Sequence, residues 1–269
     1  MSIAEKYRVE PGSPVSLSDY DPEDTSEAQD KDSAKAQSAK LQERLAELQE
    51  VLYAEHKKRV LIVLQGMDTS GKDGAIQHVM GGFNPQGVRV ESFKKPTEPE
   101  LERDFLWRVH MRVPTNGEIV VFNRSHYEDV LVVRVHDLVP PEVWKARYQQ
   151  INDFERMLVE SGTLVIKLFL HISKDEQRKR LQARIDDPGK RWKFQHSDLE
   201  ARKLWKSYQK AYEAVLKKTS TEWAPWYVIP ANAKWYRNLV VASVVEQEIG
   251  KLKMAYPEPD LTDVVIDAP

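Results

Sequence analysis

The sequence predicts an α/β fold with three layers, in which helices cover both faces of a central parallel sheet of five strands. Short apolar runs alternate along the chain with longer segments whose apolar residues recur at helical spacing. The run Thr163–His171 is apolar almost throughout, as strands covered on both faces are. A glycine-containing loop joins the first apolar run to the helix that follows it, which is typical of α/β proteins that bind anions at their strand ends.

The length of 269 residues suits one large domain, which we place at residues 34–254. Residues 1–33 are rich in Pro, Ser, Asp and Glu and show no hydrophobic period, so we expect an N-terminal arm that is loosely held or laid across a neighbour. Residues 255–269 read as a C-terminal tail containing Pro and Asp. Within the domain we expect a helical lid at about residues 174–215.

The composition excludes several classes of function. A formal charge of -2 with 30% charged residues gives no general attraction to nucleic acid or membrane, so any anion site must be local. The absence of cysteine excludes disulfides, thiol catalysis and cysteine-bound metals, and the seven histidines lack zinc-ligand spacing. We find neither a signal-peptide core nor an apolar run long enough to span a bilayer, and therefore expect a cytoplasmic protein without nucleic-acid or membrane partners.

The first half of the domain begins with an amphipathic helix over residues 34 to about 58, followed by a strand at Val60–Leu64. The pattern Gly66-x-x-x-x-Gly71-Lys72 comes next and opens a second helix. Glycines let backbone N–H groups turn toward an anion, the helix N-terminus adds partial positive charge, and the lysine adds a full charge. The predicted ligand is a chain of phosphates.

Two acidic residues depart from this phosphate-loop pattern. Asp73 stands where a Ser or Thr hydroxyl would contact Mg²⁺, which weakens assignment to an ordinary nucleotide site. Asp68 lies inside the loop, where a carboxylate repels phosphate unless a cation lies between them or a proton must be taken. We predict a metal-binding or catalytic role for Asp68. The alternative is a chance glycine turn in which both acids only cap the helix.

The next two strands are expected to bring side chains to the same edge of the sheet. Residues 87–93 form a strand that ends in Lys94 and Lys95, and these lysines either bind phosphate or form a solvated basic turn. A helix over Glu98–Met111 follows. The strand at residues 117–122 is strongly apolar and leads into a second polar segment.

That second segment is where a phosphate-loop enzyme carries a further acidic motif. Asn123 ends the strand in place of an aspartate, and Arg124 follows as a potential bidentate clamp on phosphate oxygens. Glu128 and Asp129 are candidates for metal binding or for positioning the nucleophile. They could instead only complement a helix dipole.

The second half of the domain contains a helix at residues 141–161, the strand 163–171 and a locally basic stretch. Between residues 174 and 210 basic side chains outnumber acidic ones two to one. Helical spacing predicts a helix, a turn and a second helix over about 198–219, which would form a cationic lid over the phosphate loop. A solvated basic face is the alternative. A short strand at residues 226–230 and a helix at 237–251 complete the domain.

Four motifs together carry a family resemblance. They are Gly66-Met-Asp-Thr-Ser-Gly-Lys-Asp-Gly74; Lys95-Pro-Thr97 with Asp104-Phe-Leu-Trp-Arg108; Phe122-Asn-Arg-Ser-His-Tyr127; and Asp187-Pro-Gly-Lys-Arg-Trp-Lys193 with Trp205 and Tyr208. Over about residues 40–250 the chain resembles the polyphosphate kinase 2 family, whose fold is that of thymidylate-kinase-like phosphate-loop proteins. In that family Gly or Asp replaces the usual hydroxyl, which accounts for Asp73.

The resemblance implies reversible transfer of a terminal phosphoryl group from inorganic polyphosphate to a nucleotide, with Mg²⁺ or alternatively Mn²⁺. Asn123 together with Glu128 and Asp129 resembles the subgroup that accepts both AMP and ADP, giving ADP and ATP. The presence of asparagine rather than aspartate leaves metal binding at position 123 in doubt, since an amide is a poor Mg²⁺ ligand. A homo-oligomer, either dimer or tetramer, is also implied.

The expected site therefore has three groups of residues. The catalytic residues are Asp68, Lys72, Arg124 and Glu128, with Asp68 and Glu128 as metal ligands. Polyphosphate is expected to contact Gly66, Thr69, Ser70, Gly71, Lys72, Asp73, Gly74, Arg124, Arg134, Arg178, Arg184, Lys190, Arg191 and Lys193. The nucleotide is expected to contact Lys94, Lys95, Asp104, Arg108, Asn123, Glu128 and Asp129.

Two alternative functions remain at this stage. An ATP-dependent nucleoside monophosphate kinase would use the same fold, although Asp73 argues against it. A non-catalytic module that binds polyanions could use the basic lid alone. The near-neutral total charge and the acidic residues inside the loop argue against the second alternative.

Overall fold

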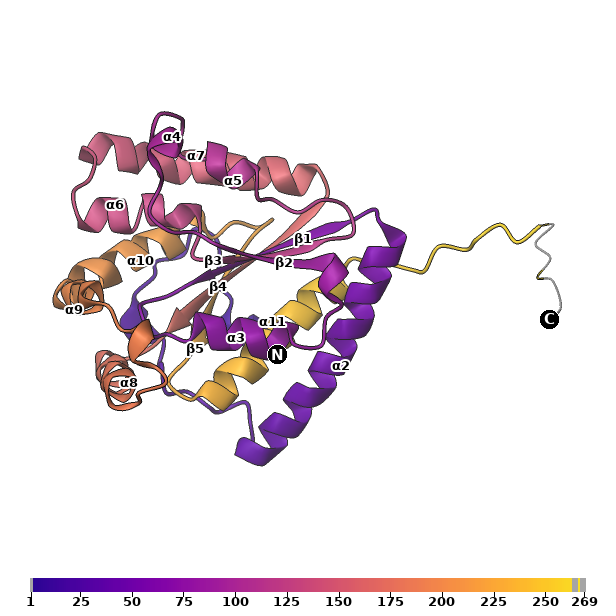
Figure 1. Ribbon diagram of the computed structural model, residues 1–269, viewed down its shortest axis with the longest axis horizontal. Coiled ribbons are helices and arrows are strands. Elements are labelled where there is room, and N and C mark those ends of the chain that lie inside the picture. The colour runs from indigo at the N-terminus through magenta and orange to yellow at the C-terminus, as the bar shows by residue number, and fades with distance from the viewer. Residues whose placement is uncertain (1, 263–265, 267–269) are drawn as a thin grey trace.

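The computed structural model describes residues 2–262 and 266, and five parallel strands form its single sheet in the order β2-β3-β1-β4-β5 (Figure 1). Each connection between neighbouring parallel strands crosses over through helices, as the alternation of apolar runs predicted. The three-layer α/β fold expected from the sequence is confirmed. The strands are β1 (Arg59–Gln65), β2 (Val88–Ser92), β3 (Ile119–Asn123), β4 (Thr163–His171) and β5 (Trp226–Pro230).

Helices cover both faces of the sheet (Figure 1). On one face α11 (Lys234–Gly250) packs against β4, β5 and the helices α2 (Lys31–Glu55) and α3 (Lys72–Met80). On the other face α7 (Pro141–Glu160) packs against β4 and α10 (Trp205–Thr219). The central strands therefore lie between two helical layers.

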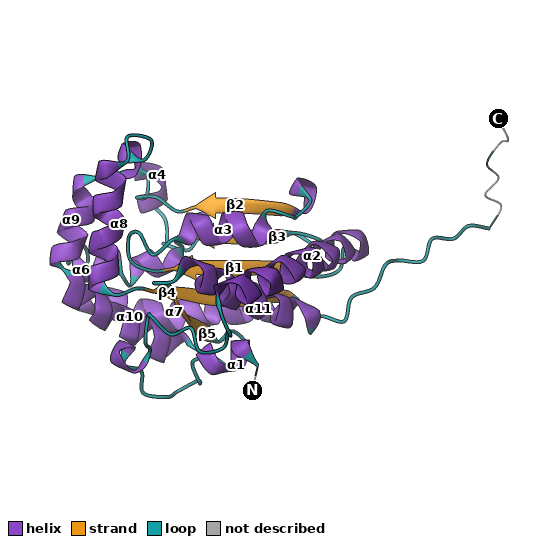
Figure 2. Cartoon of the chain, turned by 90° about the horizontal axis from the view of Figure 1, so that it is seen from below, coloured by secondary structure: helices purple, strands orange, loops and turns teal. Residues whose placement is uncertain are grey.

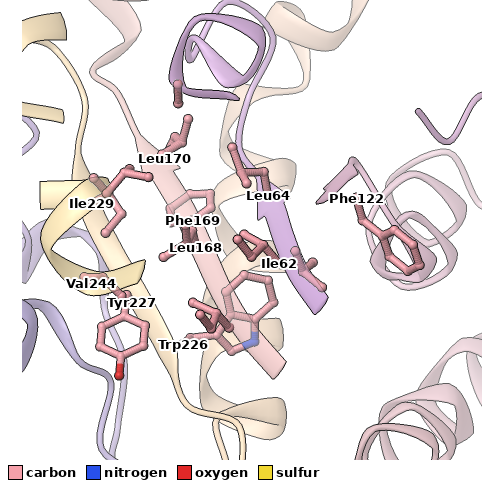
Figure 3. Close-up of a cluster of buried hydrophobic side chains, with 14 of the residues drawn as sticks. Ile62, Leu64, Phe122, Leu168, Phe169, Leu170, Trp226, Tyr227, Ile229 and Val244 are labelled. Carbon is pink, nitrogen blue, oxygen red and sulfur yellow. The ribbon is translucent and has the colours of Figure 1, made fainter. Parts of the chain in front are cut away.

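The core lies where the central strands meet these helices. Figure 3 shows Ile62 and Leu64 of β1 beside Leu168 of β4, with Trp226 and Val244 from later elements close by. All five side chains are almost fully removed from solvent. The apolar runs of the sequence are thus buried on both faces of the sheet, which fixes the register of the strands.

The helices of the expected lid begin beyond the carboxyl ends of the strands. In Figure 2 the arrowhead of β2 points toward α8 (Lys174–Asp186) and α9 (His196–Lys203). The single second lid helix expected over 198–219 is wrong, because the chain breaks at Leu204 between α9 and α10. The shorter helices are α1 (Ile3–Tyr7), α4 (Glu98–Leu101), α5 (Trp107–His110) and α6 (Val132–Val135), with single turns at Leu17–Asp19, Pro85–Gly87, His126–Asp129 and Arg191–Lys193.

The continuous helix expected over 98–111 is also wrong. It is divided into α4 and α5 by a non-helical segment. Within that segment the carboxylate of Asp104 accepts a hydrogen bond from the N–H of Leu106 at 3.0 Å. Aspartate bound to nearby backbone competes with helix continuation, which explains the break.

The N-terminal segment is packed rather than loosely held, which corrects the expectation for residues 1–33. The N–H of Val9 donates to the carbonyl of Trp226 in β5 at 2.8 Å, and the hydroxyl groups of Tyr7 and Tyr236 lie 2.7 Å apart. Tyr7, Val9 and Leu17 are buried in the main core. These apolar side chains enter the core one at a time and at irregular spacing. No periodic pattern in the sequence therefore predicts their burial.

Beyond α11 the chain leaves the domain as an extended segment (Figures 1 and 2). Residues 255–262 and 266 are exposed. The remainder of the predicted tail, residues 263–265 and 267–269, lies outside the described residues. In the described part of the chain, no helix combines the length and apolar character needed to cross a membrane.

Candidate active site

The phosphate loop joins β1 to α3 and depends on two glycines with positive φ. Gly66 has φ of 152°, and a Cβ there would lie 2.7 Å from the carbonyl oxygen of Leu170. Gly71 has φ of 98° and is the N-cap of α3, with no side chain capping the helix. A side chain at either position would distort the loop. The first N–H groups of α3 are consequently left open to an anion.

Side chains from the lid helix α8 hold the other side of this loop. Gln177 donates to the carbonyl of Asp68 at 3.2 Å, and Arg180 donates to the carbonyls of Thr69 at 2.9 Å and Ser70 at 3.1 Å. The C=O and N–H of a trans peptide point in opposite directions. The N–H groups of Thr69 and Gly71 therefore point away from α8, and neither has a hydrogen-bond partner among the described residues.

Lys72 is buried at the start of α3. Its ammonium group donates to the carbonyl of Gly66 at 2.8 Å and to that of Met67 at 3.4 Å. Burial, with a smaller contribution from Arg124, lowers the pKa of Lys72 to about 8. The ammonium group is thus held beside the loop by neutral carbonyls that only partly compensate its positive charge. A group that binds a phosphate oxygen is expected to keep such uncompensated charge.

Arg124 follows β3 and adopts a left-handed backbone conformation with φ of 61°. Its guanidinium pairs with Asp68 and lies 3.5 Å from the carboxylate of Glu128. Glu128 has the largest effect in raising the pKa of Arg124, and Asp68 adds to it against the opposing effect of burial. Residues held in sparsely populated backbone regions are concentrated at functional sites.

Asp73, which replaces the usual hydroxyl of the loop, and Asn123, which replaces an aspartate at the end of β3, contact each other. The amide of Asn123, at the end of β3, donates to the carboxylate of Asp73 in α3 at 2.8 Å. An aspartate at position 123 would place two carboxylates together and remove this donor. The two departures are therefore mutually compatible.

The carboxylates around Arg124 fit a magnesium ion. Glu128 Oε1 is buried without a hydrogen-bond partner in the described part of the chain, so one carboxylate oxygen remains available. No group of three or more acidic, histidine or cysteine side chains in the described residues could hold a metal alone. Mg²⁺ commonly binds through one or two carboxylates together with substrate phosphates, so Asp68 and Glu128 stay candidates for that type of site.

A cleft of about 760 Å³ lies over the phosphate loop and beneath the lid. Nine cationic and three acidic side chains line it, although the whole chain carries a formal charge of -2. The cations are Lys72, Lys94, Arg124, Arg180, Arg184, Lys190, Lys193, Lys234 and Arg237, and the acids are Asp68, Asp73 and Asp198. The fold has concentrated positive charge where β1, β3, the lid and α11 meet.

Twelve of the predicted site residues line this cleft. They are Asp68, Thr69, Gly71, Lys72, Asp73, Gly74, Lys94, Asn123, Arg124, Arg184, Lys190 and Lys193. Gly66, Ser70 and Glu128 lie behind that lining, within the phosphate loop or against Arg124. Their expected roles in binding and catalysis stay predictions.

Other predicted residues are occupied elsewhere. The pair Arg134 and Tyr148 lies outside the cleft with a hydrogen bond of 3.2 Å, and Asp129 forms an ion pair of 3.0 Å with Arg147. Arg108 is buried under Lys94, to whose carbonyl it donates at 3.0 Å. Asp104 lies in the segment between α4 and α5, while Lys95, Arg178 and Arg191 are exposed outside the lining.

Sequence reasoning missed three cationic residues of the lining, namely Arg180, Lys234 and Arg237. Arg180 lies in the basic stretch between residues 174 and 210, where nothing in the sequence distinguishes it from its basic neighbours. Lys234 and Arg237 follow β5 closely, and the rule that ligands bind beyond the carboxyl ends of strands would have singled them out.

A buried polar cluster supports the segment that carries Glu128. Lys167 of β4 donates to Glu155 of α7 at 2.6 Å, and the hydroxyl of Tyr127 donates to the same carboxylate at 2.7 Å. His126 lies 3.2 Å from Glu155. Burial acts to raise the pKa of Glu155, but Lys167 and His126 more than offset it and the pKa lies below its usual value.

Comparison with known proteins gives one consistent result. Residues 28–257 match the family described as Polyphosphate kinase 2 (PPK2). The AMP/ADP-polyphosphate phosphotransferase of Meiothermus ruber is 58% identical over 256 residues, covering 95% of this chain and 96% of that protein. The ADP-polyphosphate phosphotransferase of Rhodopseudomonas palustris is 49% identical, covering 80% and 79%. The crystal structure of Polyphosphate Kinase 2 from Arthrobacter aurescens aligns with a TM-score of 0.93 at 48% identity, covering 97% and 93%.

Proposed function

The chain belongs to the polyphosphate kinase 2 family and is a polyphosphate-dependent nucleotide kinase, and we propose that it transfers the terminal phosphoryl group of polyphosphate to both AMP and ADP. The name of the Meiothermus ruber relative, which matches nearly the whole chain, includes both acceptors. The reaction is reversible in this proposal, so ATP can return a phosphoryl group to the chain.

The charge of the cleft is the observation that supports this donor best. A surplus of six positive charges, from nine cations and three acids, suits a linear polyanion. Much of this surplus lies on the lid and on α11, where polyphosphate would extend beyond the phosphate loop. A nucleoside at that place would meet charged groups rather than an apolar slot.

The residues of the cleft can perform phosphoryl transfer through positioning and charge neutralisation, which is most of what this reaction requires. The open N–H groups of the loop and the ammonium of Lys72 hold oxygens of the terminal phosphoryl groups. Arg124 exchanges its carboxylate partners for phosphate oxygens and neutralises charge in the transition state. The lid excludes water, which otherwise competes with the acceptor.

Magnesium would be held by Asp68 and Glu128 together with phosphate oxygens, and when bound it neutralises charge on the transferred group. On the opposite flank Lys94 and Asn123 are proposed to hold the acceptor nucleotide. The remaining expectations, a cytoplasmic protein acting as a dimer or tetramer, extend this proposal, and sedimentation would measure the oligomeric state.

The test supplies purified protein with Mg²⁺, long-chain polyphosphate and either AMP or ADP, and follows ADP and ATP by chromatography. We expect ADP from AMP and ATP from ADP. Product from one acceptor only would contradict the proposed range of acceptors. If ATP but not polyphosphate supports AMP phosphorylation, the donor is wrong and the site is that of an ATP-dependent kinase. Salt-sensitive binding of polyphosphate without product would indicate a non-catalytic module.

A further inference from the structure

Arg237 occupies a special place in the cleft, because its guanidinium lies directly against the phosphate loop. A Cβ added to Gly71 would overlap Nη1 of Arg237, and one added to Gly74 would lie 3.4 Å from Nη2. The residue is only 3% exposed, yet it lines the cleft. The glycines of the loop therefore serve a second purpose, which is to leave room for this arginine.

The charge of Arg237 has no acidic partner among the described residues. Its Nε and Nη2 donate only to the neutral side chain of Asn238, at 3.1 and 2.6 Å. Burial, followed by the positive charge of Arg180, lowers the pKa of Arg237 to about 10. Buried charges in proteins are ordinarily paired, because an unpaired one is strongly unfavourable. The described part of the protein supplies no anion for this arginine, so the compensating charge has to come from a ligand.

Lys234 lies one turn earlier on α11 and is exposed, unlike Arg237. It also lines the cleft and has no ion-pair partner within the described chain. Burial, followed by Arg180 and Arg237, lowers its pKa. Lys190 of the lid contributes a further positive charge nearby.

The position of this pair defines one end of the cleft. Lys234 and Arg237 follow β5, at one edge of the sheet, whereas Lys94 and Asn123 follow β2 and β3 on the other side of the phosphate loop. A chain whose terminal unit faces the β2 and β3 flank would extend its next units toward α11. The unpaired cations lie where those units would pass.

We propose that Arg237 and Lys234 form a distal phosphate subsite, which binds phosphoryl units of the donor beyond those held by the phosphate loop and gives the enzyme its preference for long inorganic chains. This inference rests on the proposed function, since it assumes a polyphosphate donor. It adds a determinant of donor length on α11, outside the loop and the lid.

The first experiment compares donors of two lengths. Steady-state kinetics with ADP would be measured for wild type, Arg237→Met and Arg237→Lys, using long-chain polyphosphate and tripolyphosphate. We expect Arg237→Met to lower kcat/KM about tenfold for the long chain and less than about twofold for tripolyphosphate, with KM for ADP unchanged. Arg237→Lys should recover most of the loss. Equal losses with both donors, or no loss with either, would overturn the subsite.

The second experiment uses thermal stability without nucleotide. Arg237→Met should melt at the same temperature as wild type or higher, because it removes an unpaired buried charge. Long-chain polyphosphate should raise the melting temperature of wild type more than that of the variant. A variant that melts lower and shows the same shift with polyphosphate would make Arg237 a structural residue and refute the proposal.

A matched control is Arg156→Met on the exposed face of α7, where the arginine pairs only with acidic neighbours of its own helix. It should leave donor preference and the polyphosphate shift unchanged. The same experiments distinguish failure of the proposed function from failure of the subsite. If wild type makes no product from polyphosphate, that function fails, whereas a productive wild type whose length preference survives in Arg237→Met eliminates only the subsite.

Discussion

Two regions of this protein contain clustered charges, and they differ in how those charges are compensated. Beneath the segment that carries Glu128, the fully buried pair of Lys167 and Glu155 forms a direct contact of 2.6 Å, completed by Tyr127 and by the carbonyl of Thr219. In the cleft, nine cations face three acids, and Arg237 has no acidic partner in the described chain.

The difference separates charges that hold the fold from charges that await a ligand. A compensated buried cluster fixes neighbouring elements relative to one another. An uncompensated one lowers the stability of the free protein and is relieved only when an anion binds. Substitutions in the first region should therefore mainly change stability, and substitutions in the second should mainly change turnover.

The largest effect is expected from Lys167→Met, which leaves Glu155 buried without its partner. Removing one member of a buried ion pair destabilises a protein by about 3–5 kcal/mol. Urea unfolding followed by circular dichroism would measure the loss. Arg44→Met, at an exposed pair with Glu47, should change stability by less than about 1 kcal/mol and serves as the control. A loss from Lys167→Met as small as that of the control would refute the comparison.

Lys72→Ala and Arg124→Ala test the second region. Each removes a positive charge placed for the transition state, so kcat should fall about 10²- to 10³-fold. The unfolding free energy should change less than in Lys167→Met, because neither side chain belongs to a fully buried ion pair. Steady-state kinetics and a melting curve on the same preparations would check both statements. Activity above about a tenth of wild type in either variant would rule out the assigned role.

Arg180 lines the cleft but also holds parts of the fold together, so it sharpens the comparison. Its guanidinium binds the carbonyls of Thr69 and Ser70 and, on its other side, those of Ala231 and Asn232 at 2.6 and 2.8 Å. A lysine lacks the planar fork needed to hold both loops. We expect Arg180→Lys to lose about 1.5–3 kcal/mol of stability and to lower kcat/KM for polyphosphate as well. If only one of the two quantities changes, Arg180 does not combine a structural role with a role in binding.

The smallest effect concerns pH. Lys72 must be protonated to bind phosphate, and its pKa of about 8 in the free enzyme means that kcat/KM for polyphosphate should fall about tenfold per pH unit above that value. A pH profile of wild type and Lys72→Arg would show the decline and its loss in the variant.

Stability should change in the opposite direction over the same range. The pKa of Lys72 is lowered below the usual 10.5, so the unfolded chain binds more protons than the folded one between about pH 8 and 10.5. The contribution of this group therefore makes the protein more stable as pH rises through that window. A contribution that decreases there, measured as the difference between wild type and Lys72→Met, would contradict the assignment.

Sequence reasoning succeeded where the signal is local. The strands Thr163–His171 and Trp226–Pro230 have the predicted bounds, because continuous apolar runs ending in turn residues encode them directly. The phosphate loop is similarly local. The expected helix over 98–111 failed because a short-range bond by Asp104 outweighed helical spacing.

Features that depend on tertiary contacts could not be predicted in the same way. Asp73 and Asn123 are fifty residues apart and each seemed anomalous alone, whereas their hydrogen bond explains both. The position of Arg237 after β5 points to the ligand-binding edge of the sheet, but its close approach to Gly71 is a tertiary contact that no local pattern shows. The packing of Tyr7 and Val9 on β5 likewise follows from three-dimensional proximity.

The row of cations from the phosphate loop through the lid to α11 has a consequence for how a polymer can move. Successive units of inorganic polyphosphate are identical, and lysines and arginines contact their charge rather than any unique group. A chain displaced by one unit meets the same side chains with the same oxygens, so its binding free energy is nearly periodic along the cleft. In the proposed binding mode the cleft would be a track without a fixed register, along which a shortened chain would advance to the next transfer without dissociating.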